Sequence, residues 1–296
     1  MKRRKEKGGK GVPDLHLFLG SLYVSLHFLN ALGPCSNPKS QAMARFWMGS
    51  YLRSLKLLAT DQRLPVAFPL PPPYAFIKNF LKHFKLEKED FNVLKNHKAL
   101  ISVVQERDPL SPVRGLAIGE PTTVWRHVNH PALPNRLRDL SWMVAHEILP
   151  VRTVMHSRGM AAHSTCPRPG CGAPESVRHL LWECSAAADL WATTDNLQFP
   201  DLPVREVLNA QLVLFGVSRS RVPKEKFENQ WLTLAAIKDA IWTSRNLLVR
   251  RNRQIPPAAV LRLAAANMAA AGGKPRTQPQ RRIAWAQLDG AVGAPR

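Results

Sequence analysis

The sequence contains few cysteines and few acidic residues relative to its length. Four cysteines occur in 296 residues. Three of them are clustered and one stands alone, a distribution that argues against the disulfide framework of a small secreted domain. Aspartate and glutamate total 21 against 42 lysines and arginines, so the formal net charge is +21. The 25 prolines exclude a chain of long unbroken helices. Hydrophobic residues make up 45% of the chain, enough for a core in one large domain or two small ones.

Only residues 1–36 are apolar enough to suggest a signal peptide or a membrane span. Polar residues interrupt this stretch, and Pro13 fits the first turn of a helix. We therefore predict a core-facing helix over 13–32, with no membrane partner and a nuclear or cytoplasmic location favoured over secretion. A secreted protein remains the alternative. The predicted core-facing residues recur at helical spacing: Leu15, Phe18, Leu22, Leu26 and Leu29.

Positive charge is concentrated at the two ends of the chain. Residues 1–10 and 245–296 together carry two-thirds of the excess. Basic tails most often bind nucleic acid, because they release counterions from the phosphate backbone. The alternative is a solvated, disordered end that binds nothing in particular. We predict disordered basic ends and an RNA or DNA partner.

The hydrophobic pattern predicts a mainly α protein, an irregular helical assembly with a small zinc-knuckle-like insert. We divide it into a basic lead-in (1–12), a helical region (13–134), a zinc-binding segment (135–200), C-terminal helices (201–253) and an Ala-rich helix with a disordered tail (254–296). Residues 64–74 are expected to form a Pro-rich extended linker. Residues 99–105 fit a short strand or a helix end, and residues 107–134 a loop with short turns. The remaining expected helices are 42–58, 74–84, 87–97, 135–149, 151–158, 174–192, 203–215, 223–252 and 256–271.

Three cysteines and a histidine have the spacing Cys-x4-Cys-x7-His-x4-Cys: Cys166, Cys171, His179 and Cys184. Thiolate and imidazole are the ligands that a four-coordinate structural zinc ion prefers. Pro-Arg-Pro-Gly between the first two cysteines suits a tight turn. His179 and Cys184 would lie about 140° apart on an ideal helix. Both can therefore reach one ion only if the helix is distorted or ends near Cys184. The alternative is three buried thiols and a surface histidine.

Two other patterns favour structural roles. His146-Glu147 is half of a His-Glu-x-x-His protease site, but Pro150 replaces the second histidine. Six tryptophans could stack on bases, although their helical spacing favours the core: Trp125, Trp142, Trp182, Trp191, Trp231 and Trp242.

The zinc motif and its flanks resemble the zinc-binding segment that follows the polymerase in non-LTR (LINE-type) retrotransposon reverse transcriptase proteins. The resemblance is strong over 140–191 and looser over 7–251. The first cysteine pair departs from it, since that pair is often separated by two residues rather than four. The residues that carry it are His146, Ile148-Leu149-Pro150-Val151-Arg152, Cys166, Cys171-Gly172, Glu175, His179-Leu180-Leu181, Cys184 and Leu190-Trp191.

The resemblance implies a non-catalytic region that grips template RNA and target DNA, with the polymerase part of the parent protein as a possible partner. Reverse transcriptases usually carry an Asp-Asp pair, and this chain has none, so no enzyme is expected. A second hypothesis is a protein–protein scaffold, suggested by the apolar first helix. The candidate nucleic-acid contacts are Arg152, Arg158, Arg168, Arg178, Arg245, Arg250, Arg251 and Arg253.

Overall fold

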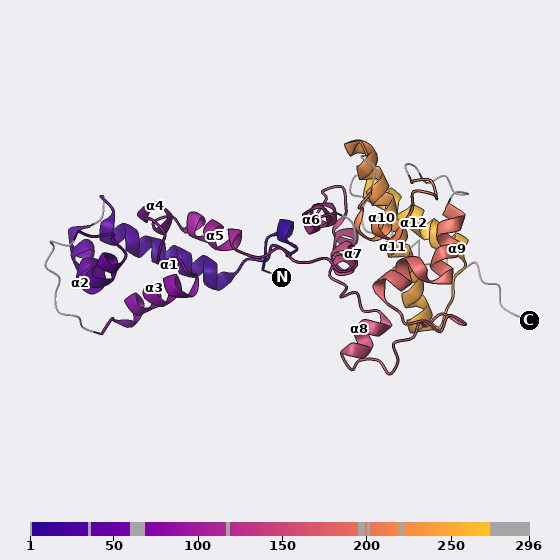
Figure 1. The fold of residues 1–296 in the computed structure, drawn as a ribbon, viewed down its shortest axis with the longest axis horizontal. Coiled ribbons are helices and arrows are strands. Elements are labelled where there is room, and N and C mark those ends of the chain that lie inside the picture. The colour runs from indigo at the N-terminus through magenta and orange to yellow at the C-terminus, as the bar shows by residue number, and fades with distance from the viewer. Residues whose placement is uncertain are drawn as a thin grey trace, which may run out of the picture. The chain divides into compact units, whose positions relative to one another are not determined.

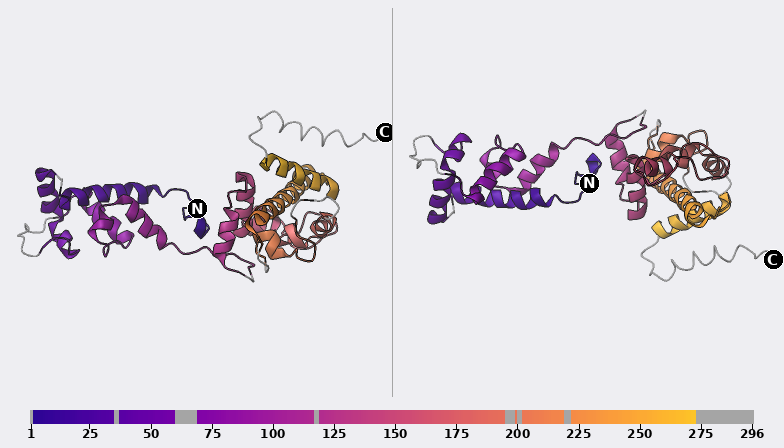
Figure 2. Two further views of the ribbon diagram at one scale, coloured as in Figure 1. Left: turned by 90° about the horizontal axis from the view of Figure 1, so that it is seen from above. Right: turned by 90° about the horizontal axis from the view of Figure 1, so that it is seen from below.

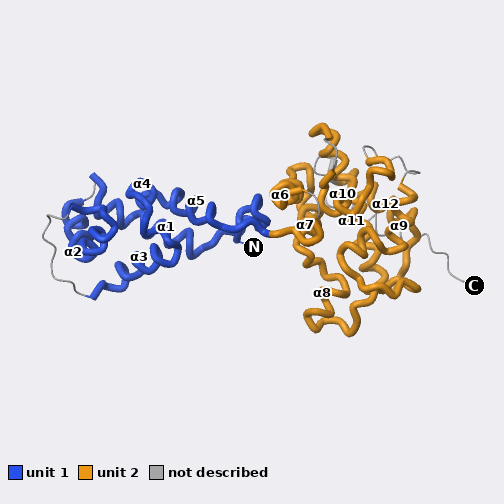
Figure 3. The backbone as a smooth tube through the Cα atoms, in the orientation of Figure 1, with its two compact units in different colours: residues 1–111 blue, residues 112–296 orange. Residues whose placement is uncertain are grey.

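The structure is a computed structural model that describes residues 2–34, 37–59, 69–116, 119–194, 199, 202–218 and 222–272. Within these residues the chain is helical without strands (Figure 1), which confirms the mainly α prediction. Two compact units form, Met1–Ser111 and Pro112–Arg296 (Figure 3), each around its own apolar cluster. The predicted boundary after residue 134 lies inside the second unit. Cys35, residues 64–68 of the expected linker and the tail 273–296 lie outside the described residues. Residues 72–73 of that linker form the first turn of a helix, so their prediction as an extended segment is wrong.

The first unit is built on α1 (Leu15–Leu32), which contacts the four other α-helices of the unit. Asp14 begins α1, because its carboxylate accepts hydrogen bonds from the backbone N–H groups of His16 and Leu17. The region 99–105 is helical, so its interpretation as a strand is wrong. The other elements of the unit are η1 (Lys5–Lys7), α2 (Pro38–Ser54), α3 (Pro72–His83), α4 (Phe91–Leu94) and α5 (His97–Glu106).

The face of α1 that packs in the core is not the predicted one. Small residues dominate the buried side, which carries Leu17, Gly20, Ser21, Val24, Ser25, Phe28 and Ala31. At Gly20 an added Cβ would lie 2.2 Å from a ring carbon of Phe80, so the close approach of α3 requires glycine. The predicted stripe, Leu15, Phe18, Leu22, Leu26 and Leu29, is exposed instead. Because α1 is apolar on most sides, periodicity did not identify the face that allows close packing.

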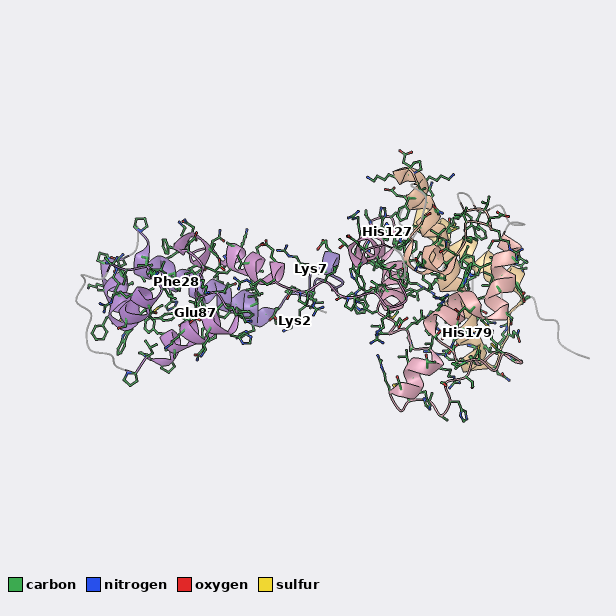
Figure 4. All side chains as sticks on the ribbon, in the orientation of Figure 1. Lys2, Lys7, Phe28, Glu87, His127 and His179 are labelled. Atoms are coloured by element: carbon green, nitrogen blue, oxygen red, sulfur yellow. The ribbon has the colours of Figure 1, made fainter. Side chains whose placement is uncertain are left out.

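The basic lead-in is folded over residues 2–11, so its prediction as a disordered end is wrong. The Lys7 ammonium donates to the carbonyl oxygens of Gln105, Glu106 and Asp108, at 3.1, 2.6 and 2.8 Å. This caps the carboxyl end of α5, where the helix dipole favours a cation. Arg4 donates to the side chains of Ser102 and Gln105 in α5. Figure 4 labels Lys2 and Lys7 in this segment.

The second unit is built on α11 (Lys224–Arg251), which packs against α7 (Asn135–Ala145), α12 (Pro257–Gly272) and η2 (His179–Glu183). Figure 2 shows α11 and α12, the orange and yellow helices, side by side. The loop predicted over 107–134 contains a helix, α6, whose first residue is Pro121. Proline is compatible with the first turn of a helix. The prediction of a loop from the number of prolines is therefore wrong for residues 121–128. The other elements are α6 (Pro121–Val128), α7 (Asn135–Ala145), α8 (Arg152–Ser157), η2 (His179–Glu183), α9 (Ser185–Thr193), α10 (Ala210–Phe215) and α12 (Pro257–Gly272).

Tryptophans supply much of the second core, as their spacing predicts. Trp125 and Trp231 are fully buried, and Trp142 and Trp191 nearly so. Trp182 and Trp242 are half-buried and pack against the same cluster. The indole N–H of Trp231 donates to the His127 carbonyl oxygen at 2.8 Å, which joins α11 to α6.

A lysine, Lys238, is also fully buried on α11. Its ammonium donates to the Leu214 carbonyl oxygen at 3.2 Å and lies 4.1 Å from the centre of the Trp231 ring. Both contacts favour the charged form, but burial opposes it more strongly and lowers the pKa of Lys238 to about 7.

The buried lysine should make stability depend on pH. Between pH about 7 and about 10.5 the unfolded state binds more protons at this position, so the unfolding free energy rises with pH. We expect Lys238→Met to be more stable than the wild type near pH 7, by up to about 4 kcal/mol. The difference should shrink towards pH about 10 in urea denaturation. The exposed Lys226→Met on the same helix is the control. A pH-independent difference would contradict the prediction.

Candidate metal centre

The first two cysteines lie in a short hairpin loop. The backbone N–H of Cys166 donates to the Ala173 carbonyl oxygen at 2.7 Å, beside an antiparallel bridge between Thr165 and Pro174. Gly170 and Gly172 have φ values of 75° and 63°, in the left-handed region that favours glycine. These two glycines flank Cys171 and turn the chain back towards Cys166, as the Pro-Arg-Pro-Gly sequence predicts.

The other two ligands come from the π-helix η2. The backbone N–H of Cys184 donates to the His179 carbonyl oxygen at 2.8 Å, five residues earlier, and η2 ends there. The wider turn carries Cys184 round to the side of His179, where an α-helix would leave the two about 140° apart. The helix is thus both distorted and ended at Cys184, which meets the condition set by the sequence. The single helix predicted over 174–192 is instead η2 followed by α9.

The four ligand atoms converge within 4.8 Å of one another. Cys171 Sγ lies 3.3 Å from His179 Nε2, and Figure 4 shows His179 in the second unit. A tetrahedral zinc ion with Zn–S of about 2.3 Å and Zn–N of about 2.0 Å needs ligand atoms roughly 3.5 to 3.8 Å apart. The donor set therefore fits zinc. All four positions are filled by side chains, the arrangement of a structural site rather than a catalytic one.

The thiols of Cys166 and Cys184 interact with each other. The Cys166 thiol donates a hydrogen bond to the Cys184 sulfur, which lowers the pKa of Cys184 to about 5. That bond, together with burial, raises the pKa of Cys166. The charge of Arg168, in the loop between Cys166 and Cys171, also lowers the pKa of Cys184. Zinc, when bound, would hold all three sulfurs as thiolates.

Glu175 ties the metal segment to the rest of the second unit. Its carboxylate is fully buried and receives two hydrogen bonds from Arg245 of α11, Nε to Oε1 at 2.9 Å and Nη2 to Oε2 at 2.7 Å. The backbone N–H of Arg152 donates to Oε2 at 2.7 Å, at the amino end of α8. The Glu175 N–H donates to the Ser164 carbonyl oxygen, across the hairpin. One residue thus joins the hairpin, α8 and α11.

The candidate nucleic-acid contacts separate into three groups. Arg245 is buried and paired with Glu175, so its guanidinium is not presented to a ligand. Arg178 is exposed and pairs with Glu183 at 2.6 Å. The others are Arg158, Arg250 and Arg251, which are exposed, and Arg152, Arg168 and Arg253, which are half-buried.

Other histidines lie outside the metal cluster. His156 and His163 are exposed in the segment before the hairpin. His146 packs against Trp125 and Trp142, with ring centres 4.6 and 4.4 Å away. These contacts agree with the expectation that His146 packs in the fold and is not part of a protease metal site.

Removing one partner of the buried pair should cost much more than removing an exposed one. Glu175→Gln leaves the Arg245 charge buried without its counter-charge, for which we expect a loss of about 3–5 kcal/mol of unfolding free energy. The double variant Glu175→Gln with Arg245→Met should recover part of it. Urea denaturation with saturating zinc measures both.

The matched control for this prediction is Glu183→Gln, which breaks the exposed pair with Arg178 and should cost less than about 1 kcal/mol. Equal losses for Glu175→Gln and Glu183→Gln would show that the buried pair does not tie the unit together.

Comparison with known proteins agrees with this geometry. No curated protein and no solved structure matches the chain. A family model described as zinc-binding in reverse transcriptase matches residues 116–191, a stretch that begins before α6, ends in α9 and contains the four ligands. The match covers less than half of the chain, so it describes this segment alone. Residues 116–191 are thus similar to the zinc-binding domain of reverse transcriptases.

Proposed function

We propose that the second unit is a zinc-stabilised nucleic-acid-binding module, derived from a LINE-type retrotransposon reverse transcriptase protein. The observation that carries the proposal is the Cys3His cluster, which lies inside the segment matched by the zinc-binding family model. In the proposed role the module holds RNA or DNA and catalyses no step. The polymerase part of a parent protein is a further proposed partner.

The charges around the metal segment support an anionic ligand. Residues 152–183 contain four arginines against two glutamates, Glu175 and Glu183. Glu175 is already neutralised inside the fold by Arg245. A zinc ion with three thiolates and a neutral imidazole carries a net charge of −1, which Arg168 is placed to offset. Arg178 already pairs with Glu183. Arg152, which is half-buried, and Arg158, which is exposed, are therefore left without an ion pair among the described residues.

A second group of exposed cations lies at the carboxyl end of α11, at Arg250 and Arg251. The helix dipole stabilises positive charge there. Exposed arginines suit phosphate, because the planar guanidinium can donate two parallel hydrogen bonds to it. These contacts would give affinity for the backbone of RNA or DNA without reading its sequence.

A protein–protein scaffold without a nucleic-acid role is the second candidate. The exposed apolar side of α1 favours it, since six large residues of one helix contact water there: Leu15, Phe18, Leu19, Leu22, Leu26 and Leu29. This surface belongs to the first unit, so the two functions are compatible.

Zinc should be required for the fold of the second unit. We expect Cys171→Ser, or a chelator, to melt residues 112–272, because metal binding free energy is folding free energy in such sites. Native mass spectrometry would give the zinc content, and circular dichroism the helix content. Cys35→Ser, at the cysteine outside the cluster, is the control and should keep one zinc ion. Persistent helices in a zinc-free chain would contradict the expectation.

Binding to nucleic acid should weaken steeply with salt. We expect log Kd to rise linearly with log salt for single-stranded RNA and duplex DNA. Arg250→Gln with Arg251→Gln should lower the slope by about 2, because two phosphate contacts are lost. Fluorescence anisotropy of labelled oligonucleotides measures the slope. The control, Lys224→Gln with Lys226→Gln at the opposite end of α11, should leave it nearly unchanged. Absent binding at low salt would refute the proposed function.

A further inference from the structure

Five leucines form a row along the exposed side of α1. Leu15, Leu19, Leu22, Leu26 and Leu29 follow one another at intervals of four, three, four and three residues. This alternation is the heptad spacing of a coiled-coil seam, in which every position is apolar and faces a partner helix. Here every position is leucine.

The leucine row is open to solvent. Leu15, Leu19 and Leu26 are 68, 59 and 51% exposed, and Leu22 and Leu29 are 37 and 39% exposed. The opposite side of α1 is already occupied, because Val24 and Phe28 are fully buried in the first core. One side of the helix is therefore used for folding, and the other has the pattern of a helix contact with no partner among the described residues of this unit.

The charge distribution favours a second copy of this chain as the partner. Residues 15–32 contain no lysine, arginine, aspartate or glutamate, in a chain with a net charge of +21. Two copies repel each other over most of their surface, and α1 offers a contact where that repulsion is smallest. The row carries no charges that would specify a different partner by complementarity. It is also nearly self-complementary, since a two-fold axis at Leu22 relates Leu15 to Leu29 and brings Leu19 and Leu26 within one residue of matching.

We propose that two copies of this chain dimerise through the leucine row, with the two α1 helices antiparallel. Leu22 packs on its counterpart at the two-fold axis, and Leu15 of each copy packs on Leu29 of the other. The contact is isologous, so it closes as a dimer and leaves no open end for further copies.

Electrostatics selects the antiparallel orientation. Residues 2–10, just before α1, carry six cations against Glu6. A parallel pair would bring these two segments together at one end. An antiparallel pair separates them by the length of α1, about 27 Å for 18 residues, which is well beyond the screening length of about 8 Å at physiological salt. Antiparallel helix dipoles also attract each other.

A membrane surface is the competing occupant. In the part of the chain that the structure describes, α1 is the one helix long and apolar enough to cross a bilayer. However, 39% of its apolar window is buried in the first unit. Insertion would therefore have to remove Val24 and Phe28 from their core, whereas dimerisation uses only the side that is already exposed.

Sedimentation equilibrium of the full chain, freed of nucleic acid by nuclease and high salt, tests the proposal. We expect a species of twice the chain mass of 33.1 kDa. Leu19→Glu with Leu26→Glu should raise the dimer Kd at least about tenfold and leave the helix content unchanged, because both side chains are exposed. The control, Met160→Glu with Val204→Glu, alters two exposed apolar residues of the second unit and should stay dimeric.

Cysteine crosslinking tests the orientation, in zinc-loaded chains that also carry Cys35→Ser. A mixture of Leu15→Cys and Leu29→Cys chains should crosslink more than either chain alone. Crosslinking of Leu15→Cys to itself would overturn the antiparallel arrangement.

A wild-type chain that is monomeric at about 100 µM, or a glutamate variant that remains dimeric, would overturn the dimer. The dimer would also be overturned if the monomeric wild-type chain floated with neutral phosphatidylcholine vesicles and the Leu19→Glu, Leu26→Glu variant did not float with them. None of these results depends on nucleic-acid binding.

Discussion

The buried pair between Glu175 and Arg245 connects the metal segment to the longest helix of its unit. Both groups are removed from water, at 0 and 5% exposure, so each needs the other to offset the cost of desolvation. The fork of Arg245 fills both carboxylate oxygens, and the Arg152 N–H uses a remaining position. The hairpin that carries Cys166 and Cys171 is fixed on one side by this network. The metal would fix it on the other, since η2 supplies His179 and Cys184.

The π-helix η2 fixes the other two metal ligands, His179 and Cys184, relative to each other. A spacing of four residues between His179 and Cys184 is unfavourable in an α-helix and suitable in a turn closed by an i to i+5 hydrogen bond. The wider turn disrupts the regular backbone pattern, and side chains compensate. The Trp191 indole donates to the Leu181 carbonyl oxygen at 2.9 Å, and the Ser176 hydroxyl accepts from the His179 N–H at 2.9 Å. The same turn therefore brings His179 and Cys184 to one side and keeps its backbone groups hydrogen-bonded. Ser176 and Trp191 supply two of those hydrogen bonds.

Features that depend on near neighbours could be predicted from the sequence, and those that depend on distant contacts could not. The ligand set, the tight turn before Cys171 and the need for a distorted helix all follow from local spacing, and the structure brings the four ligands together. The burial of Arg245 could not be foreseen, because its partner Glu175 is 70 residues away. Nothing in the basic character of residues 2–11 indicated that Lys7 would cap α5, about 100 residues later in the chain. For α1 the period was correct, but the packing face was decided by Gly20 against Phe80.

These contacts change what the net charge of +21 means for binding. Part of the positive charge is used inside the fold: Arg245 on Glu175, Arg136 on Asp239 and Lys7 on the carboxyl end of α5. Such cations stabilise one arrangement of the chain, and Arg245 is so deeply buried that a phosphate could reach it only by breaking its pair with Glu175. The charge available to a polyanion is therefore smaller than the composition suggests, and it depends on cations that have no internal role. Arg250 and Arg251, exposed in the last turn of α11, are such cations. Because α11 also carries Arg245, a ligand held at its end would be held by the same helix that anchors the metal segment.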